Sequence, residues 1–145
     1  MDIRIRNNQR TKNLATASLK KRLGTLLRSI GLPDAELSIL FIGDRAMRAL
    51  NRRYRDQDKT TDVLSFSLRE GRFTHIQPDM LGDIVISVPA AARQARGGGQ
   101  SLAAELDRLL VHGLAHLLGY DHERGREEAR RMKRKEHQLL KRLSP

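Results

Sequence analysis

Three of the five histidines in this 145-residue chain, His112, His116 and His122, fall within eleven positions. His112 and His116 are four residues apart, so on a helix they share one face, with about 5–6 Å between Cβ atoms. Gly119 can adopt the left-handed backbone that turns a chain sharply off a helix, so that His122 returns a third imidazole. This spacing predicts a metal site with three protein ligands and a fourth position for water, as a hydrolytic zinc centre requires.

The residue that follows the first histidine helps to distinguish a peptide substrate from a nucleic-acid substrate. The same spacing occurs in metzincin proteases, H-E-x-x-H-x-x-G-x-x-H, in which the glutamate takes a proton from the metal-bound water. This chain has Gly113 in place of that glutamate. A phosphodiester substrate instead needs its developing phosphoryl charge neutralised, which a metal and a positioned arginine can provide. Gly113 therefore favours a nucleic-acid substrate over a peptide.

The charge distribution also favours a polyanionic partner. The formal net charge is +11; residues 1–31 carry +7, residues 123–145 carry +5 and the middle of the chain carries −1. Basic ends beside a near-neutral centre predict contacts with an RNA backbone, although the solvated faces of two amphipathic helices would give the same pattern. Only five aromatic residues are present, so we expect phosphate contacts rather than base stacking to dominate.

Composition narrows the class of protein. The absence of cysteine excludes disulfides, thiolate metal sites and a cysteine nucleophile. No stretch approaches the roughly 18 apolar residues of a membrane span, and the amino terminus lacks the apolar segment of a secretory signal. We expect one domain over residues 1–145, located in the cytoplasm.

The elements that must position the histidines follow from hydrophobic periodicity. It predicts an α+β domain with about four strands in a mixed sheet and about five helices. The expected strands are Asp2–Arg6, Glu36–Ile42, Val63–Leu68 and Leu81–Ser87. The expected helices are Thr11 to about Ile30, one capped by Asp44 and reaching Tyr54, one opened by Pro89, one capped by Ser101 and reaching about Leu118, and Glu123–Leu143. A surface loop is expected over Glu70–Asp79, and His75 and His137 are expected on the surface.

The sequence H-G-L-A-H-L-L-G-Y-D-H over residues 112–122 closely resembles the signature of the YbeY family of bacterial rRNA-maturation endoribonucleases. The resemblance covers most of the chain from about residue 36, through residues 50–55, 61–66 and 81–87 to Met132 and Glu136. Two positions depart from the family pattern: Ala115 stands where leucine is usual, and Ser67 where proline commonly follows Phe66.

The resemblance implies a zincin-like α+β fold and one Zn²⁺ per chain at His112, His116 and His122, although imidazoles also accept ions such as Ni²⁺. It implies cleavage of single-stranded RNA, maturation of the 3′ end of the small-subunit (16S) rRNA, and ribosome quality control with the small ribosomal subunit as partner. Neither DNA nor a membrane is expected as a partner. The match at Tyr54-Arg55 implies that Arg55 is the catalytic arginine, whose planar guanidinium can hold a phosphate through two hydrogen bonds.

The sequence leaves alternatives open for the function and for the roles of two aspartates. A metallohydrolase of other substrates, or a ribosome-assembly factor with a structural metal, would use the same histidines, and a fourth protein ligand would favour the latter. Asp121 could orient a ligand imidazole or only shape the turn before the last helix. Asp83 lies in an apolar strand, where we expect an ion pair or a histidine contact because an unpaired buried carboxylate is costly.

Overall fold

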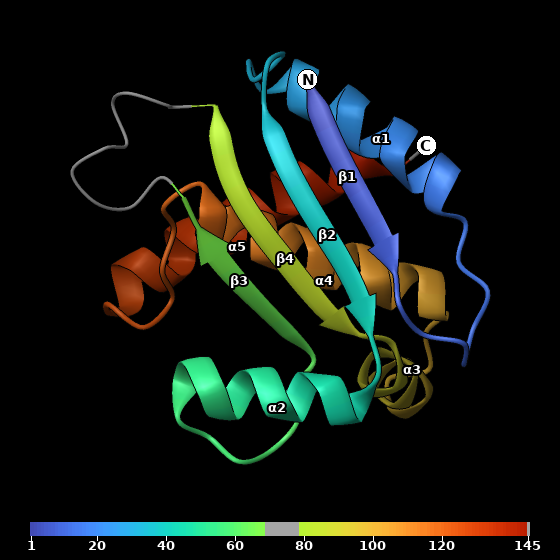
Figure 1. The fold of residues 1–145 in the computed structure, drawn as a ribbon. Helices are drawn as coiled ribbons and strands as arrows, with labels where there is room; N and C mark the ends of the chain where they lie inside the picture. The colour runs from blue at the N-terminus through green and yellow to red at the C-terminus, as the bar shows by residue number, and fades with distance from the viewer. Residues whose placement is uncertain (69–78, 145) are drawn as a thin grey trace.

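The computed structural model describes residues 1–68 and 79–144, so the predicted loop before Asp79 lies outside the described residues, as does His75. The described residues form an α+β fold with five helices and four strands, which confirms the predicted class (Figure 1). In chain order the elements are β1 (Asp2–Asn7), α1 (Thr16–Ser29), β2 (Glu36–Ile42), α2 (Asp44–Arg55), β3 (Val63–Ser67), β4 (Met80–Ser87), α3 (Val88–Gly97), α4 (Leu102–Leu117) and α5 (Arg126–Leu143).

The sheet is mixed, as predicted, and its strands lie in the order β1-β2-β4-β3. The first three of these strands are parallel, and β3 pairs antiparallel with β4 at one edge. Helices α1, α4 and α5 cover one face of the sheet, while α2 crosses the strand ends on the other face (Figure 1). One sheet face is therefore well covered, and the other is covered only in part.

Side-chain alternation along β2 explains this arrangement. Leu37, Ile39 and Phe41 are almost fully buried in the main core against the helices, whereas Ser38 and Leu40 point to the other face and stay partly exposed. Each buried side chain of this size contributes about 1.5–3 kcal/mol relative to an exposed one. A smaller buried cluster joins α2 to the other face of the sheet and consists of Ile42, Met47, Leu64 and Val85.

Gly82 allows the edge strand to lie against its neighbour. Its φ is +137°, in the region that favours glycine, and a Cβ at this position would collide with the carbonyl oxygen of Phe66 in β3. The pairing of β2 with β4 shifts register beside it, between Glu36 and Leu37. Glycine at position 82 thus places β3, one wall of the cleft described below.

The first helix is shorter than the periodicity predicts. It begins at Thr16 rather than Thr11. The Gln9 side chain brackets the preceding turn: its Nε2 donates to the carbonyl of Lys12 at 2.8 Å, and the Lys12 amide donates to its Oε1 at 3.1 Å. This local side-chain bonding holds the chain in a bend instead of a first helical turn.

The last helix also begins late, at Arg126 rather than Glu123. The carboxylate of Asp121 accepts a hydrogen bond from the Glu123 amide at 2.9 Å, which closes a turn. Gly125 then takes a φ of +130° immediately before the helix. The turn and the glycine together delay the start of α5 by three residues.

The predicted cap of α2 is wrong, because Gly43 occupies the N-cap and the Asp44 side chain bonds elsewhere. Its carboxylate accepts from the Ser87 hydroxyl at 2.9 Å, from Thr60 at 3.3 Å, and from Arg93 at 2.6 and 3.1 Å. Asp44 therefore ties the start of α2 to β4, α3 and the loop before β3. The predicted Ser101 cap of α4 is confirmed by its bond to the Ala104 amide at 3.1 Å.

Across residues 1–68 and 79–144, none of the helices has the length and apolar character that crossing a membrane would need.

Candidate metal centre

The three clustered histidines lie where α4 ends and the chain turns. The rings of His112 and His116, on the last two turns of α4, have centroids 4.8 Å apart. The ring of His122 lies 5.6 Å from the first and 5.3 Å from the second. The apolar face of the same helix, which includes Leu110, Leu114 and Leu117, is buried in the core, and it fixes the helix so that both rings point outward to one side.

The turn that returns His122 is a Schellman motif. Gly119 has a φ of +100°, its amide bonds the His116 carbonyl at 3.0 Å, and the Tyr120 amide bonds the Ala115 carbonyl at 3.1 Å. These two bonds satisfy carbonyls at the end of the helix while reversing the chain. The predicted role of Gly119 as the helix stop is confirmed.

One ring nitrogen from each histidine lies within 4.8 Å of the other two, so the group could hold a metal ion. Three imidazoles fit a borderline ion such as Zn²⁺, and they equally suit other late divalent metals. No aspartate, glutamate or further histidine joins the group in the part of the chain that the structure describes.

Burial favours the neutral, metal-binding form of the central imidazole. Desolvation lowers the pKa of His116 below its usual value, and the neighbouring His112 and His122 lower it further. Asp121 and a hydrogen bond with the Tyr120 backbone oppose this shift. Because a histidine binds a metal only when its nitrogen is unprotonated, the lowered pKa suits a ligand.

The structure gives a steric reason for Gly113. The residue is buried where α4 packs on β4, and a Cβ there would lie only 2.9 Å from Cγ2 of Ile84. Position 113 therefore faces the sheet, and it has no room for the glutamate side chain of the metzincin motif.

The histidines open into a cleft of about 800 Å³. The end of α2, strand β3 and the turn between α4 and α5 line it. Arg55, the last residue of α2, lines the same cleft, and its Nη2 donates to the Ser65 carbonyl at 3.4 Å. Two further cations, Lys59 and Arg124, also line it. The structure thus brings Arg55 and the three histidines to one cavity from segments about 57 to 67 residues apart.

Asn51 was not identified from the sequence. It is buried in α2, and its Nδ2 donates to the Lys59 carbonyl at 2.8 Å, which holds the loop along the cleft wall. The available signal was an amide one helical turn after Met47, on the apolar face of the helix.

Asp121 shapes the turn and also lies beside the histidines. Its pKa is lowered chiefly by the Glu123 amide that donates to it, then by Arg124, whose Nε lies 3.3 Å from its carboxylate, and by His116 and His122. The turn-forming alternative is therefore observed directly. The hydrogen bond that the Asp121 carboxylate accepts comes from the turn and not from an imidazole.

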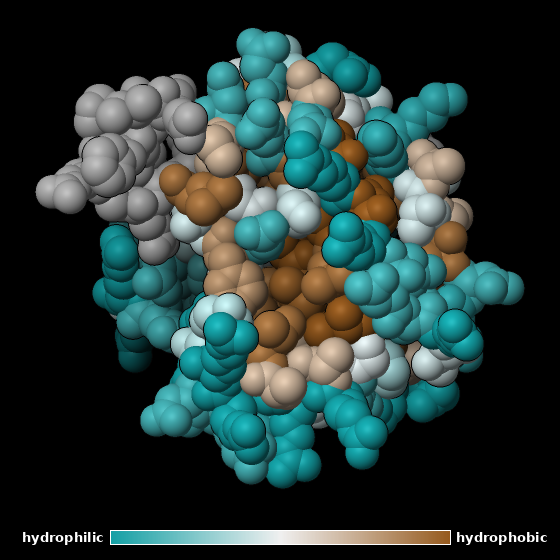
Figure 2. Space-filling model, in the orientation of Figure 1, coloured by the Kyte–Doolittle hydropathy of each residue, from teal (hydrophilic) through white to brown (hydrophobic). Residues whose placement is uncertain are grey.

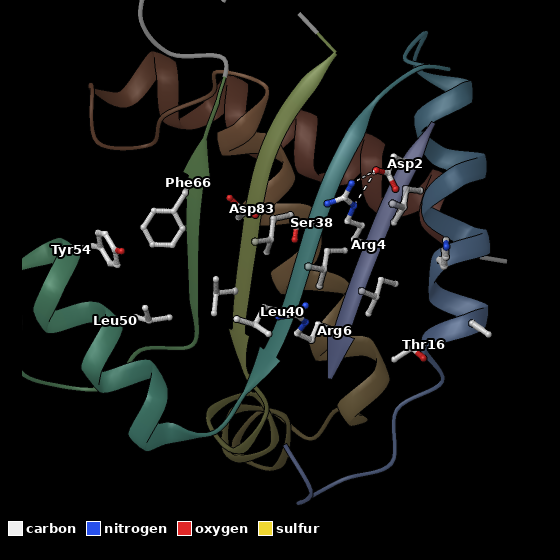
Figure 3. A pocket seen from close by; sticks show the side chains of 17 residues that line it. Asp2, Arg4, Arg6, Thr16, Ser38, Leu40, Leu50, Tyr54, Phe66 and Asp83 are labelled. Atoms are coloured by element: carbon white, nitrogen blue, oxygen red, sulfur yellow. Dashed lines mark hydrogen bonds and ion pairs between the residues drawn. The ribbon is translucent and has the colours of Figure 1, made fainter. Parts of the chain in front are cut away.

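Asp83 is only partly buried, and among the described residues it forms neither the ion pair nor the histidine contact that we expected for a buried carboxylate. Asp83 points from β4 to the opposite, open face of the sheet and lies beside Ser38 (Figure 3). That face carries a separate hollow of about 860 Å³, whose floor is apolar and whose rim is hydrophilic (Figure 2). Partial exposure to water in this hollow accounts for a carboxylate within an apolar strand. The expectation for His137 is confirmed, since it is exposed on α5.

Comparisons with known proteins identify the family. A family model described as Endoribonuclease YbeY matches residues 4–144, so the similarity includes the amino-terminal third. A relative named Endoribonuclease YbeY from Geobacter metallireducens is 45% identical over 141 residues, which cover 97% of this chain and 94% of the relative. Another of that name from Aquifex aeolicus is 43% identical over 148 residues, covering 95% and 97%.

A solved structure agrees with these matches. The solution structure of a protein from Thermotoga maritima superimposes with a TM-score of 0.69 at 25% identity, covering 97% of this chain and 88% of the other. Its fold supports the α+β architecture described above. On the family model and the relatives together, the chain belongs to the YbeY endoribonuclease family.

Proposed function

We propose that this chain is a metal-dependent endoribonuclease that cleaves single-stranded RNA. The observation that carries the proposal is the cleft shared by the three histidines and Arg55. The relatives named Endoribonuclease YbeY support RNA as the substrate and internal cleavage as the reaction. The lack of space for a glutamate at Gly113 argues against the metzincin route to peptide hydrolysis.

His112, His116 and His122 are the proposed ligands of one Zn²⁺, with Ni²⁺ as another ion that the same donors accept. A divalent ion bound there supplies Lewis-acid polarisation of a phosphoryl oxygen and lowers the pKa of a bound water. Three donors leave a coordination position open, which a structural site with four protein ligands would not. This favours catalysis over an assembly factor with a structural metal.

Arg55 is the proposed catalytic residue. Its guanidinium is exposed at the cleft wall, and the Ser65 carbonyl holds one nitrogen while the other donors stay available to a phosphate. Lys59 and Arg124 line the same cleft and would contact phosphates of the strand on either side of the scissile bond. The cleft chemistry is thus suited to a phosphate backbone rather than to particular bases.

The biological setting is a finer proposal that rests on family membership. We infer that the substrate is the precursor of the small-subunit (16S) rRNA, cleaved near its 3′ end, and that the chain acts with the small ribosomal subunit in ribosome quality control in the cytoplasm. Support within the chain comes from the basic residues 1–31 and 123–145, which suit contacts with an RNA backbone.

The test compares His116→Ala with His137→Ala, because His137 is an exposed histidine outside the cluster. We expect His116→Ala to lose both bound metal and RNA cleavage, and His137→Ala to keep both. Metal analysis of the purified proteins and a cleavage assay on single-stranded RNA, each with and without chelator, give the readouts. Casein serves as an alternative substrate. Full RNA cleavage by a metal-free His116→Ala protein, or cleavage of casein but not RNA, would contradict the proposal.

A further inference from the structure

One metal-binding histidine has a carboxylate partner on another helix. Nδ1 of His112 lies 2.7 Å from Oε1 of Glu136, in a contact that joins α4 to α5. Both side chains are about three-quarters buried, with 28% and 26% of their surface exposed. The distance is within the range of strong hydrogen bonds to a charged acceptor.

We infer that Glu136 is a positioning residue that fixes the ring orientation and the tautomer of His112; this inference rests on the proposed function. An ionised carboxylate only accepts hydrogen bonds, so the proton of the neutral imidazole must sit on Nδ1. Nε2 is then left with its lone pair, ready to face a metal. Carboxylate partners of this kind orient and strengthen histidine ligands in metal proteins.

The packing of α5 explains how the carboxylate is aimed. Met132, Leu139 and Leu143 are buried in the core at helical spacing, and Glu136 follows Met132 by four residues on the same stripe. An acidic residue thus occupies a position that the amphipathic pattern would give to an apolar one. The buried neighbours fix the backbone of Glu136 on the side of α5 that packs against α4, within reach of His112.

The other two histidines are held differently. The ring of His116 has the backbone of Tyr120 as a polar neighbour at the end of α4. A carboxylate oxygen of Glu123 lies 3.9 Å from Nε2 of His122, which is beyond hydrogen-bond reach. In the described residues, Glu136 is the only carboxylate that bonds one of the three rings.

The contact between Glu136 and His112 has an alternative role, which is to join α4 to α5 without affecting the orientation of the imidazole. Arg108, one turn before His112 on α4, also feels the charge of Glu136: its pKa is raised first by the Glu105 side chain and, less strongly, by Asp62 and Glu136. Glu136 could therefore serve only to join α4 to α5. The two roles differ in what happens to the His112 ring when the carboxylate is removed.

The experiment uses Glu136→Ala, Glu136→Gln and the control Glu128→Gln, which alters an acid on the same helix that pairs with Arg131 instead. Nitrogen-15 NMR of the metal-free full-length protein, at a pH above the imidazole pKa, reads the tautomer of His112. Competition with a chromophoric chelator gives the affinity for Zn²⁺. Thermal unfolding reports whether each variant is folded.

In the wild type we expect the Nδ1–H tautomer at His112. Glu136→Ala should populate the Nε2–H form and weaken Zn²⁺ binding by about 10–100-fold. Glu136→Gln keeps an acceptor oxygen, so it should retain the tautomer and lose less affinity, and Glu128→Gln should change neither.

An unchanged tautomer and a Zn²⁺ affinity within about twofold of the wild type in folded Glu136→Ala would overturn the inference. If that variant does not fold, Glu136→Gln decides through its Zn²⁺ affinity: an affinity below that of Glu128→Gln supports the inference, and an affinity within about twofold of the wild type overturns it. A wild-type chain that binds no Zn²⁺ would defeat the proposed function separately, because the tautomer is measured without metal.

Discussion

Arg55 ends α2 with its guanidinium in the cleft, so its side chain can be changed without touching the proposed ligands. We expect Arg55→Ala to leave metal content intact and to lower RNA turnover by about 10²-fold or more, as loss of one donor to developing charge does in other enzymes. Arg55→Lys should recover little, because an ammonium cannot bond two phosphate oxygens in the same planar way.

The matched control for this prediction is Arg52→Ala, which removes an exposed arginine in the last turn of the same helix. Single-turnover cleavage rates and metal analysis of the three variants provide the comparison. Turnover unchanged by Arg55→Ala would show that the residue is an ordinary surface arginine.

At Gly113, the added methyl group of alanine would press on Ile84. We expect Gly113→Ala to lower the free energy of unfolding by about 1–3 kcal/mol, as overpacking does, despite the better helix propensity of alanine. Gly97→Ala is the control, since nothing lies within 4 Å of a Cβ at that helical position. Denaturant unfolding measures both, and partial rescue by adding Ile84→Ala would locate the cause. A Gly113→Ala protein as stable as the wild type would refute this account.

The amino-acid sequence predicts some of these residues better than others. The spacing of His112, His116 and His122 was sufficient to predict that they converge, because a helical period and one glycine turn determine it. Arg55 came only from the family resemblance, since it reaches the cleft through the fold and not through nearby sequence. Asp83 was misplaced, because an alternating strand does not reveal which of its faces carries the helices.

Among the elements, the strands agree with prediction to within a residue, because alternation and flanking turn residues mark them clearly. The starts of α1 and α5 were misplaced. In each case a side chain, Gln9 or Asp121, bonds the backbone of a neighbouring turn and stops a helix that periodicity alone would extend. Such bonds depend on local geometry that hydrophobic spacing does not record.

The junction of α2, α3 and β4 depends on the ionised Asp44. Its pKa is lowered, first by the hydrogen bonds from Arg93 and also by those from Ser87 and Thr60. Because the pKa is lower in the folded protein, the stability that this charge contributes is present above the unfolded pKa of about 3.9 and is lost as pH falls through the folded value.

We expect Asp44→Asn to lower the free energy of unfolding by about 1 kcal/mol at neutral pH. The difference from the wild type should shrink below about pH 4. The exposed Asp34→Asn serves as control, and denaturant unfolding across the acid range is the measurement. A difference that stays constant down to pH 2 would exclude the ionised carboxylate as its source.

At the scale of the whole molecule, the basic ends predict binding that depends strongly on salt. For single-stranded RNA, the slope of log affinity against log salt is about −0.7 for each phosphate contact. Neutralising two exposed cations of α5, with Lys133→Gln and Arg134→Gln, should weaken binding and make that slope shallower. Titration of a single-stranded RNA oligomer at several salt concentrations measures it.

The control for the salt experiment is Arg96→Gln on α3, which removes an exposed positive charge outside the basic ends. We expect its slope to match that of the wild type. If the slope of log affinity against log salt were equal for all variants, or if the affinity for RNA did not depend on salt, the basic ends would be only solvated surface.

The contact between Gly113 and Ile84 also bears on how far this scaffold can be redesigned. A library that varies position 113 alone, in search of a peptidase base, would lose stability at every substitution, because a side chain there meets Ile84. Productive variants would have to change positions 84 and 113 together, or shift the whole of α4 and the two histidines it carries. A change from this histidine cluster to a metzincin-like site therefore couples position 113 to position 84.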